Sequence, residues 1–272
     1  MFWVAPSIQG GGIDSPRPAS QRAAAFILTA AMLTTLAAPA FAGTWYIEDG
    51  DITVKAGETE GTNKVSQGAN QEVEDTDTII TNQKTDTASS NTVTIDAEND
   101  KVEVKLDNVN IKADSGSALT SKGDVTLTLK GDNHLTGGIS DTGNYGRNGI
   151  ASTGSLTITG GENDSLTAQG GSGADGSYGG HGIYSNGSLT ITGGTVNATG
   201  GDGSNVNGSG ISSNGSVTIS GGTVKAAGGD SKDSYGGDGI RSGGGVTISG
   251  GSTVTANGGN GGNVSGDGIR SD

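Results

Sequence analysis

The residues of this chain that could bind a ligand recur at similar positions along the sequence. Tyr145, Tyr178 and Tyr235 each stand five residues before an isoleucine. A row of phenol rings can stack against sugar rings, because each ring combines an apolar body with a polar hydroxyl group. Val206 and Val264 occupy the same position in the other copies. That alternation favours packing of the row against the fold, although carbohydrate binding by the tyrosines stays open.

Acidic residues form a second recurrent group. Asp238 and Asp267 stand two residues before an isoleucine, and Asp202 and Asp233 lie in neighbouring loops. Calcium takes several oxygen ligands, including the backbone carbonyl groups that glycine-rich turns expose. Asp-Gly is also ordinary turn chemistry. The sequence therefore leaves open either calcium binding by these four residues or a set of structural turns.

Basic residues and histidines complete the candidates. Arg241 and Arg270 directly follow isoleucines in successive copies, where they would face an acidic polysaccharide. His134 and His181 occupy different positions in the repeat and have no evident carboxylate partner, and cysteine is absent. Acid–base and nucleophilic catalysis need partner groups within hydrogen-bond reach. The sequence therefore predicts that the protein is not an enzyme.

Threonines and serines two residues apart also recur. They are Thr126/Thr128, Thr157/Thr159, Thr190/Thr192, Thr218/Ser220 and Thr247/Ser249. On adjacent strands they would form two ranks of hydroxyl groups, which can order water or ice. The simpler interpretation is a solvated strand face, because threonine is the polar residue best suited to strands.

These positions recur because the chain is a repeat. Its marker residues are Ile150, Ile183, Ile211, Ile240 and Ile269, so the steps are 33, 28, 29 and 29 residues. Each unit holds three short alternations of apolar and polar residues, separated by glycine or Asn-Gly corners. Three strands per repeat match one coil of a solenoid. We predict an all-β, right-handed parallel β-helix of three-strand coils, each 28–33 residues long.

A disordered linker is the alternative, since 53 of the 272 residues are glycine. A linker has no reason to keep its aliphatic residues in register over five copies. Conversely, one coil buries too few aliphatic side chains to offset the entropy of ordering its backbone. The coils must therefore stack to fold, and the register favours the solenoid.

The two ends of the chain differ from the repeats. Residues 1–42 are predicted to be a signal peptide with an unusual N-terminal extension, because a basic start and an apolar run precede an Ala-x-Ala site ending at Ala42. Residues 43–90 are predicted to form an N-terminal cap or irregular first coil, with a hairpin between residues 45–47 and 52–54. The β-helix is expected over residues 91–272 and is expected to continue past Asp272.

The formal net charge of −14 argues against nucleic acid and anionic membranes as partners. We expect no membrane insertion of the mature chain, since the apolar run within residues 1–42 is short for a membrane span. With the predicted signal peptide, this indicates a secreted or cell-surface protein.

Three segments carry a resemblance to a known family. Asp-Gly-Ile-Arg-Ser occurs at 238–242 and 267–271, Ser-Leu-Thr-Ile-Thr-Gly-Gly-Thr-Val at 188–196, and Leu-Asp-Asn-Val-Asn-Ile at 106–111. Over residues 91–272 the chain resembles bacterial cell-surface carbohydrate-binding domain-containing proteins with a parallel β-helix similar to that of pectate lyases. The resemblance implies binding of acidic plant polysaccharide with calcium, at Asp238 and Asp267, without strong lyase activity.

The sequence thus predicts a secreted or surface-displayed, non-catalytic protein for carbohydrate binding or adhesion. Its glycan contacts would come from Tyr145, Tyr178, Tyr235, Arg241 and Arg270, with calcium as the cofactor. The main alternative is a structural adhesin or autotransporter-type stalk with no defined glycan site. A polysaccharide lyase-like enzyme and an ice-binding protein are further alternatives.

Overall fold

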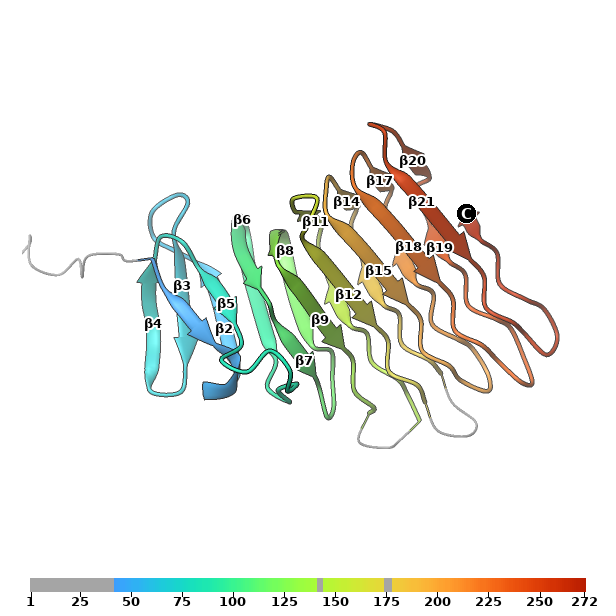
Figure 1. The fold of residues 1–272 in the computed structure, drawn as a ribbon, viewed down its shortest axis with the longest axis horizontal. Coiled ribbons are helices and arrows are strands. Elements are labelled where there is room, and N and C mark those ends of the chain that lie inside the picture. Colours follow the sequence, from blue (N-terminus) through green and yellow to red (C-terminus); the bar gives the residue numbers. More distant parts are fainter. Residues whose placement is uncertain (1–41, 141–143, 174–177) are drawn as a thin grey trace, which may run out of the picture. The chain divides into compact units, whose positions relative to one another are not determined.

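The computed structural model describes residues 42–140, 144–173 and 178–272. Over these residues the protein is a parallel β-solenoid of about six turns, roughly 29 residues apart (Figure 1). The predicted all-β parallel β-helix is therefore confirmed. The predicted signal peptide, except for its last residue, lies outside the described residues.

Each regular coil places one strand on each of three faces. The first face holds β10 (Ile150–Ser152), β13 (Ile183–Ser185), β16 (Ile211–Ser213), β19 (Ile240–Ser242) and β22 (Ile269–Ser271). The second face holds β11 (Leu156–Thr159), β14 (Leu189–Ile191), β17 (Val217–Ile219) and β20 (Val246–Ile248). The third face, a separate sheet, holds β7 (Asn110–Lys112), β9 (Asp132–Thr136), β12 (Ser165–Gln169), β15 (Thr195–Thr199), β18 (Thr223–Ala227) and β21 (Thr253–Asn257). The longer strands β6 (Val93–Asp107) and β8 (Leu119–Lys130) run along both the first and second faces.

Equivalent residues of successive coils pair in register, so the aliphatic positions stack inside. Ile150 pairs with Ile183, and the register continues through Ile211 to Ile240, each of which is fully buried. Because strand side chains alternate between faces, the intervening polar residues point outward. The coil that begins at Ile269 differs, because Ile269 is 46% exposed.

The N-terminal segment is built differently from the predicted hairpin. The short strand β1 (Thr44–Tyr46) pairs in parallel with β5 (Ile79–Thr81), and the single-turn 3-10 helix η1 (Ile47–Asp49) follows it. Strand β2 (Ile52–Ala56) pairs in parallel with the start of β6 and antiparallel with β3 (Asn63–Gln67), which pairs with β4 (Asn70–Asp75). The hairpin between residues 45–47 and 52–54 was a wrong prediction, because η1 carries the chain from the second face to the first.

A buried carboxylate fastens this segment. Asp75 is fully buried and accepts hydrogen bonds from Gly43 N (2.9 Å), Trp45 Nε1 (2.7 Å) and Asp77 N (3.0 Å). A buried carboxylate is tolerated only when donors replace its water. These contacts tie the start of β1 to the end of β4, which lie far apart in the sequence.

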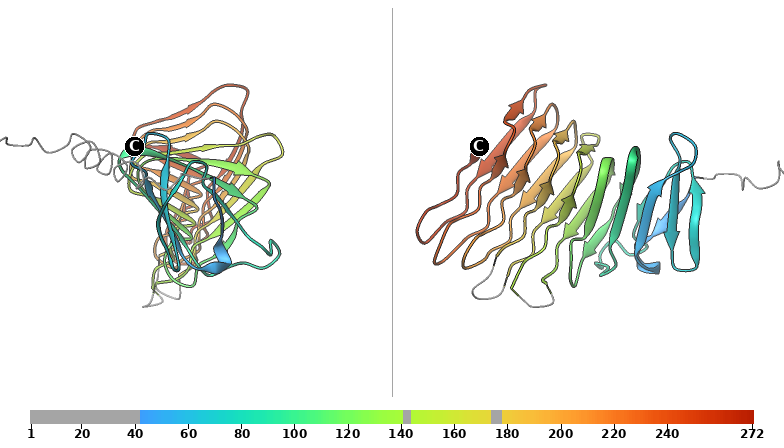
Figure 2. Two further views of the ribbon diagram at one scale, coloured as in Figure 1. Left: turned by 90° about the vertical axis from the view of Figure 1, so that its left-hand side faces the viewer. Right: turned by 180° about the vertical axis from the view of Figure 1, so that it is seen from behind.

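The loops that lead from the third face back to the first stack along one edge of the solenoid (Figure 2). A chain of backbone hydrogen bonds crosses them, alternately within a coil and between coils. Its links run from Gly171 N to Arg147 O, Gly180 N to Gly171 O, Gly201 N to Gly180 O, Gly208 N to Gly201 O, Gly229 N to Gly208 O, Gly237 N to Gly229 O, Gly259 N to Gly237 O and Gly266 N to Gly259 O. A Cβ atom at Gly208 would lie 1.7 Å from Gly180 O. These glycines are therefore required by close backbone approach.

Candidate functional site

The predicted tyrosine row lies in the second half of these loops, shortly before the strands of the first face. We call it the tyrosine ridge: Tyr145, Tyr178, Val206, Tyr235 and Val264, joined by parallel bridges from coil to coil. The five side chains are 40–56% exposed, so the expected packing against the fold is not found. The rings of Tyr145 and Tyr178 stack on each other, with centroids 5.1 Å apart and planes 10° apart. Because each of these two rings has one face covered by the other, less aromatic surface is left for a sugar.

The residues two before each marker isoleucine form a ladder of hydrogen-bond acceptors. Asn148 Oδ1 accepts from His181 N (2.8 Å), and His181 Nδ1 accepts from Ser209 N (2.9 Å). Asp238 Oδ1 accepts from Asp267 N (2.8 Å) in the last two coils. Side chains at this position therefore tie one coil to the backbone of the next. That contact explains why Asn, His and Asp interchange here.

A similar ladder runs through the first half of the loops, shortly after the strands of the third face. Ser172 Oγ accepts from Asp202 N (3.2 Å), Asp202 Oδ1 from Asp230 N (2.8 Å), and Asp230 Oδ1 from Asn260 N (2.7 Å). Asp202 and Asp230, together with Asp233, line a hollow of about 550 Å³ at the loop tips. The structure thus brings Asp202 near Asp233 but gives Asp202 a structural bond as well.

These contacts bear on the predicted calcium ligands. Asp238 is 7% exposed and one of its carboxylate oxygens is occupied by Asp267 N. Within residues 42–140, 144–173 and 178–272, no three or more His, Cys, Asp or Glu side chains are grouped to hold a metal ion. Asp238 therefore has a structural contact, as Asp202 does, and its other acceptor positions stay open. Calcium binding at Asp238 and Asp267 remains a prediction, as does calcium binding at Asp202 and Asp233.

The two predicted arginines lie on the first face, in register with each other. Arg241 Nη2 contacts Asp272 Oδ2 at 3.0 Å, and Arg270 Nε contacts Asp272 Oδ1 at 3.2 Å. Arg241 also lines a groove of about 470 Å³. We call this the first-face groove; its walls are His181, Tyr184, Ser212, Ser213, Asn214, Arg241, Gly243 and Asp272. The five predicted carbohydrate-binding residues therefore divide between the tyrosine ridge and the first face.

The groove contains two residues that the sequence reasoning missed. Asn214 Nδ2 donates to the Tyr184 hydroxyl oxygen at 3.1 Å and to Asn186 Oδ1 at 2.8 Å. Tyr184 directly follows its marker isoleucine, the same repeat position that Arg241 and Arg270 occupy. That shared position was a usable signal, because side chains at it point outward from successive strands of one face.

His181 connects the groove to the acceptor ladder. Its ring stacks on Tyr184, with centroids 5.7 Å apart and planes 17° apart, while Nδ1 accepts from Ser209 N. Burial of the ring, and then the positive charge of Arg241, lower the pKa of His181 to about 4. The ring is therefore neutral near pH 7, as an Nδ1 acceptor must be.

His134 does have a carboxylate partner, contrary to the expectation from the sequence. His134 Nε2 lies 3.0 Å from Asp132 Oδ2, and the Ser165 hydroxyl donates to the other oxygen, Asp132 Oδ1. The hydrogen bond from Ser165, followed by that from His134, lowers the pKa of Asp132. Because the carboxylate stands between the other two groups, the imidazole does not activate the serine hydroxyl. The triad does not have the order that nucleophilic catalysis needs.

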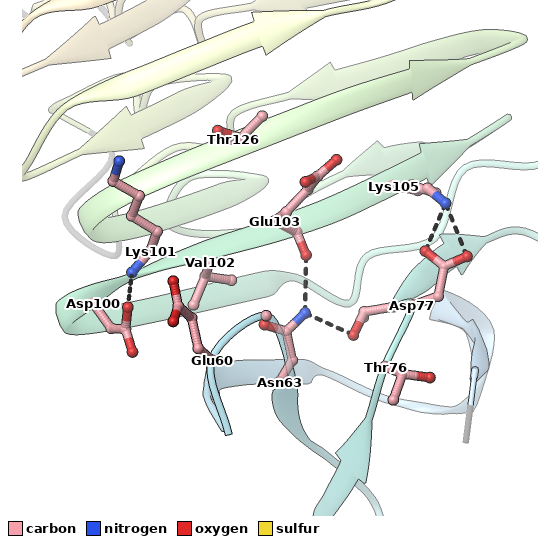
Figure 3. Close-up of a pocket in the computed structure, with 12 residues that line it drawn as sticks. Glu60, Asn63, Thr76, Asp77, Asp100, Lys101, Val102, Glu103, Lys105 and Thr126 are labelled. Carbon is pink, nitrogen blue, oxygen red and sulfur yellow. Dashed lines mark hydrogen bonds and ion pairs between the residues drawn. The ribbon is translucent and has the colours of Figure 1, made fainter. Parts of the chain in front are cut away.

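A third hollow, of about 390 Å³, lies between the N-terminal segment and the second face (Figure 3). Lys105 Nζ pairs with Asp77 Oδ1 at 2.6 Å, and Asn63 Nδ2 donates to Thr78 Oγ1 and Glu103 O, both at 2.9 Å. No sequence pattern predicts this hollow, because its walls come from segments that lie apart along the chain. The Lys105–Asp77 ion pair joins the N-terminal segment to strand β6.

The comparisons with known proteins add no relative. No family model, no curated protein and no solved structure matches the chain. Among the described residues, no helix is long and apolar enough to cross a membrane.

Proposed function

We propose that the protein is a secreted or cell-surface, non-catalytic carbohydrate-binding protein that holds an acidic polysaccharide in the first-face groove. The observation that carries this proposal is the meeting of Tyr184, Asn214 and Arg241 in one groove on a rigid sheet. A sugar site typically combines an apolar or aromatic wall with a few placed polar groups. The groove offers one aromatic ring, one amide and one guanidinium group.

Arg241 gives the groove its preference for an acidic glycan. A guanidinium group binds carboxylates through paired N–H donors. Its present partner, Asp272, is an exposed carboxylate, and such surface pairs contribute little to stability. A uronate carboxylate can therefore replace Asp272 at low cost. Arg270, one coil further, would extend the contact to a longer polymer.

The cellular setting and the cofactor complete the proposal. The signal peptide predicted over residues 1–42 supports export, and the net charge of −14 supports a partner other than nucleic acid or an anionic membrane. Calcium would offset repulsion between this chain and an acidic polymer, with Asp202 and Asp233 as its ligands. The groove residues alone would then set the affinity when calcium is absent.

A structural adhesin stalk is the second candidate. The two acceptor ladders and the chain of glycine hydrogen bonds join each coil to the next. A stalk needs such stacking and no ligand site. A lyase-like enzyme is the third candidate, and it would need acidic residues and a basic residue that converge in one groove.

Calorimetric titration with polygalacturonate and with a neutral dextran, each with and without calcium, separates these candidates. We expect saturable binding of polygalacturonate, weakened about tenfold by Arg241→Ala or Tyr184→Ala. Lys225→Ala, which removes an exposed charge from the third face, is the matched control and should bind like wild type. Loss of calcium enhancement in an Asp202→Asn/Asp233→Asn variant would support the ligand prediction. Absence of heat with either polymer would leave the stalk as the better account.

A further inference from the structure

The second face carries a regular array of hydroxyl groups that the proposed function does not use. We call it the hydroxyl face. Its central rank is Thr126, Thr157, Thr190, Thr218 and Thr247, which pair in register from strand to strand. One flanking rank is Thr128, Thr159, Thr192, Ser220 and Ser249, and the other is Ser155, Ser188 and Ser216.

The array is continuous even where the strands are short. Thr192 N donates to Ile158 O, Ser220 N to Ile191 O, and Ser249 N to Ile219 O, each at 2.9 Å. The backbone ladder therefore extends through the flanking rank. On the other side, the hydroxyl oxygens of Ser188 and Ser216 lie 3.2 Å apart. All three ranks thus rise coil by coil at the strand spacing.

The oxygens of this face are held in fixed positions. Beneath them, Leu156, Ile158, Leu189 and Ile191 are fully buried, so the strands rest on a packed core. Threonine side chains are also restricted about χ1 by their branched Cβ. The hydroxyl groups repeat about every 4.8 Å between coils and about every 6.6 Å along a strand. The face is a two-dimensional lattice of oxygens with methyl groups between them.

The outward composition of this face indicates what it can bind. The outward residues of strands β11, β14, β17 and β20 are all threonine, with no charge or aromatic ring among them. Thr157, Thr190, Thr218 and Thr247 make no side-chain hydrogen bond to the described part of the protein. Thr128 is different, since it donates to Glu103 Oε1 at 3.0 Å near the first coils. The central hydroxyl groups are therefore free to bond to water.

The third face shows that such uniformity is not general. It also carries threonines, but Asp132, His134 and Lys225 interrupt them. Charged groups orient water around themselves and so disrupt a regular layer of water on the face. A sugar would find no aromatic surface on the hydroxyl face. Charged side chains, Lys101 and Asp124, adjoin it only at its first-coil end, in a hollow with Thr126 and Thr157.

From these features we propose that the hydroxyl face binds the surface of ice. Ice is itself a lattice of oxygens, so a rigid, uncharged oxygen array can share one ordered water layer with it. Many weak contacts then add along the ranks, because every coil contributes equivalent groups. The site is independent of the first-face groove, which lies on different strands.

The test is ice affinity of the full chain, measured as thermal hysteresis and as incorporation into a growing ice hemisphere. The disruptive variant is Thr190→Lys/Thr218→Lys, with Thr190→Lys alone as a milder change. The matched control is Thr195→Lys/Thr223→Lys, which places the same charges on the same two coils but on the third face. Circular dichroism and the thermal midpoint confirm that each variant is folded.

We expect wild type and the control to enter ice, and the double variant of the hydroxyl face to lose at least tenfold of that incorporation. Arg241→Ala should enter ice like wild type, which separates this proposal from glycan binding. Absence of ice affinity in wild type, or equal loss in both lysine variants, would overturn it. Binding of wild type to crystalline cellulose or chitin through this face, without ice affinity, would overturn it in favour of a crystalline polysaccharide.

Discussion

Replacing Gly208 with alanine should destabilise the stacked loops more than any exposed substitution nearby. The new Cβ atom would lie 1.7 Å from Gly180 O and 2.4 Å from Gly180 C, both backbone atoms. The two loop legs would have to separate by more than 1 Å to accept it. That movement breaks the hydrogen bonds from Gly201 N to Gly180 O (2.7 Å) and from Gly208 N to Gly201 O (3.1 Å).

The expected cost follows from these two effects. Two lost backbone hydrogen bonds cost about 0.5–1.5 kcal/mol each. Forcing a methyl group into a packed site costs about 1–3 kcal/mol. The total of about 2–6 kcal/mol is a large fraction of the stability of an ordinary domain, which is about 5–15 kcal/mol. We therefore expect Gly208→Ala to lower the free energy of unfolding strongly or to open the loops locally.

Gly161→Ala is the matched control, because its Cβ would meet only the side chain of Asp164, at 3.0 Å from Oδ2. A side chain can move aside, so we expect a loss below about 1 kcal/mol. Urea unfolding followed by circular dichroism compares the variants, and amide hydrogen exchange at Gly201 and Gly229 reports local opening. Equal midpoints and equal exchange in both variants would refute the view that close backbone approach requires these glycines.

Three further predictions concern two contacts that join one coil to the next and one contact within the N-terminal segment. The pKa of His181 is about 4 in the folded chain and about 6.5 when unfolded, so its contribution to folding stability is complete above pH 6.5 and is lost as the pH falls through 4, by up to about 3 kcal/mol. His181→Asn keeps an acceptor and should make the thermal midpoint less dependent on pH between pH 6.5 and 5. Asp238→Ala leaves Asp267 N without its acceptor and should cost about 1–3 kcal/mol, whereas Asp238→Asn should cost little, as urea midpoints will show. Trp45→Phe removes one donor from the buried carboxylate of Asp75 and should cost about 1–3 kcal/mol; an unchanged urea midpoint would contradict that role.

The ladders explain a feature of the sequence that resembles ligand chemistry. Asp, Asn, His and Ser recur at loop positions because each can accept a hydrogen bond from the next coil's amide. The same residue types would serve as calcium ligands, so sequence spacing alone does not separate the two roles. Asp238 shows this directly, since it is buried and bonded to Asp267 N.

The repeat by itself determined the solenoid, the stacking isoleucines and the outward threonine ranks. Periodicity suffices there, because equivalent residues of stacked coils must meet and strand side chains alternate between inside and outside. The sequence did not determine the pairing of Trp45 with Ile80 or the exposure of the tyrosine ridge. It also did not place Tyr184 and Asn214 in a groove with Arg241. These features depend on which loops and strands meet across coils, and that is decided by backbone close approach in three dimensions.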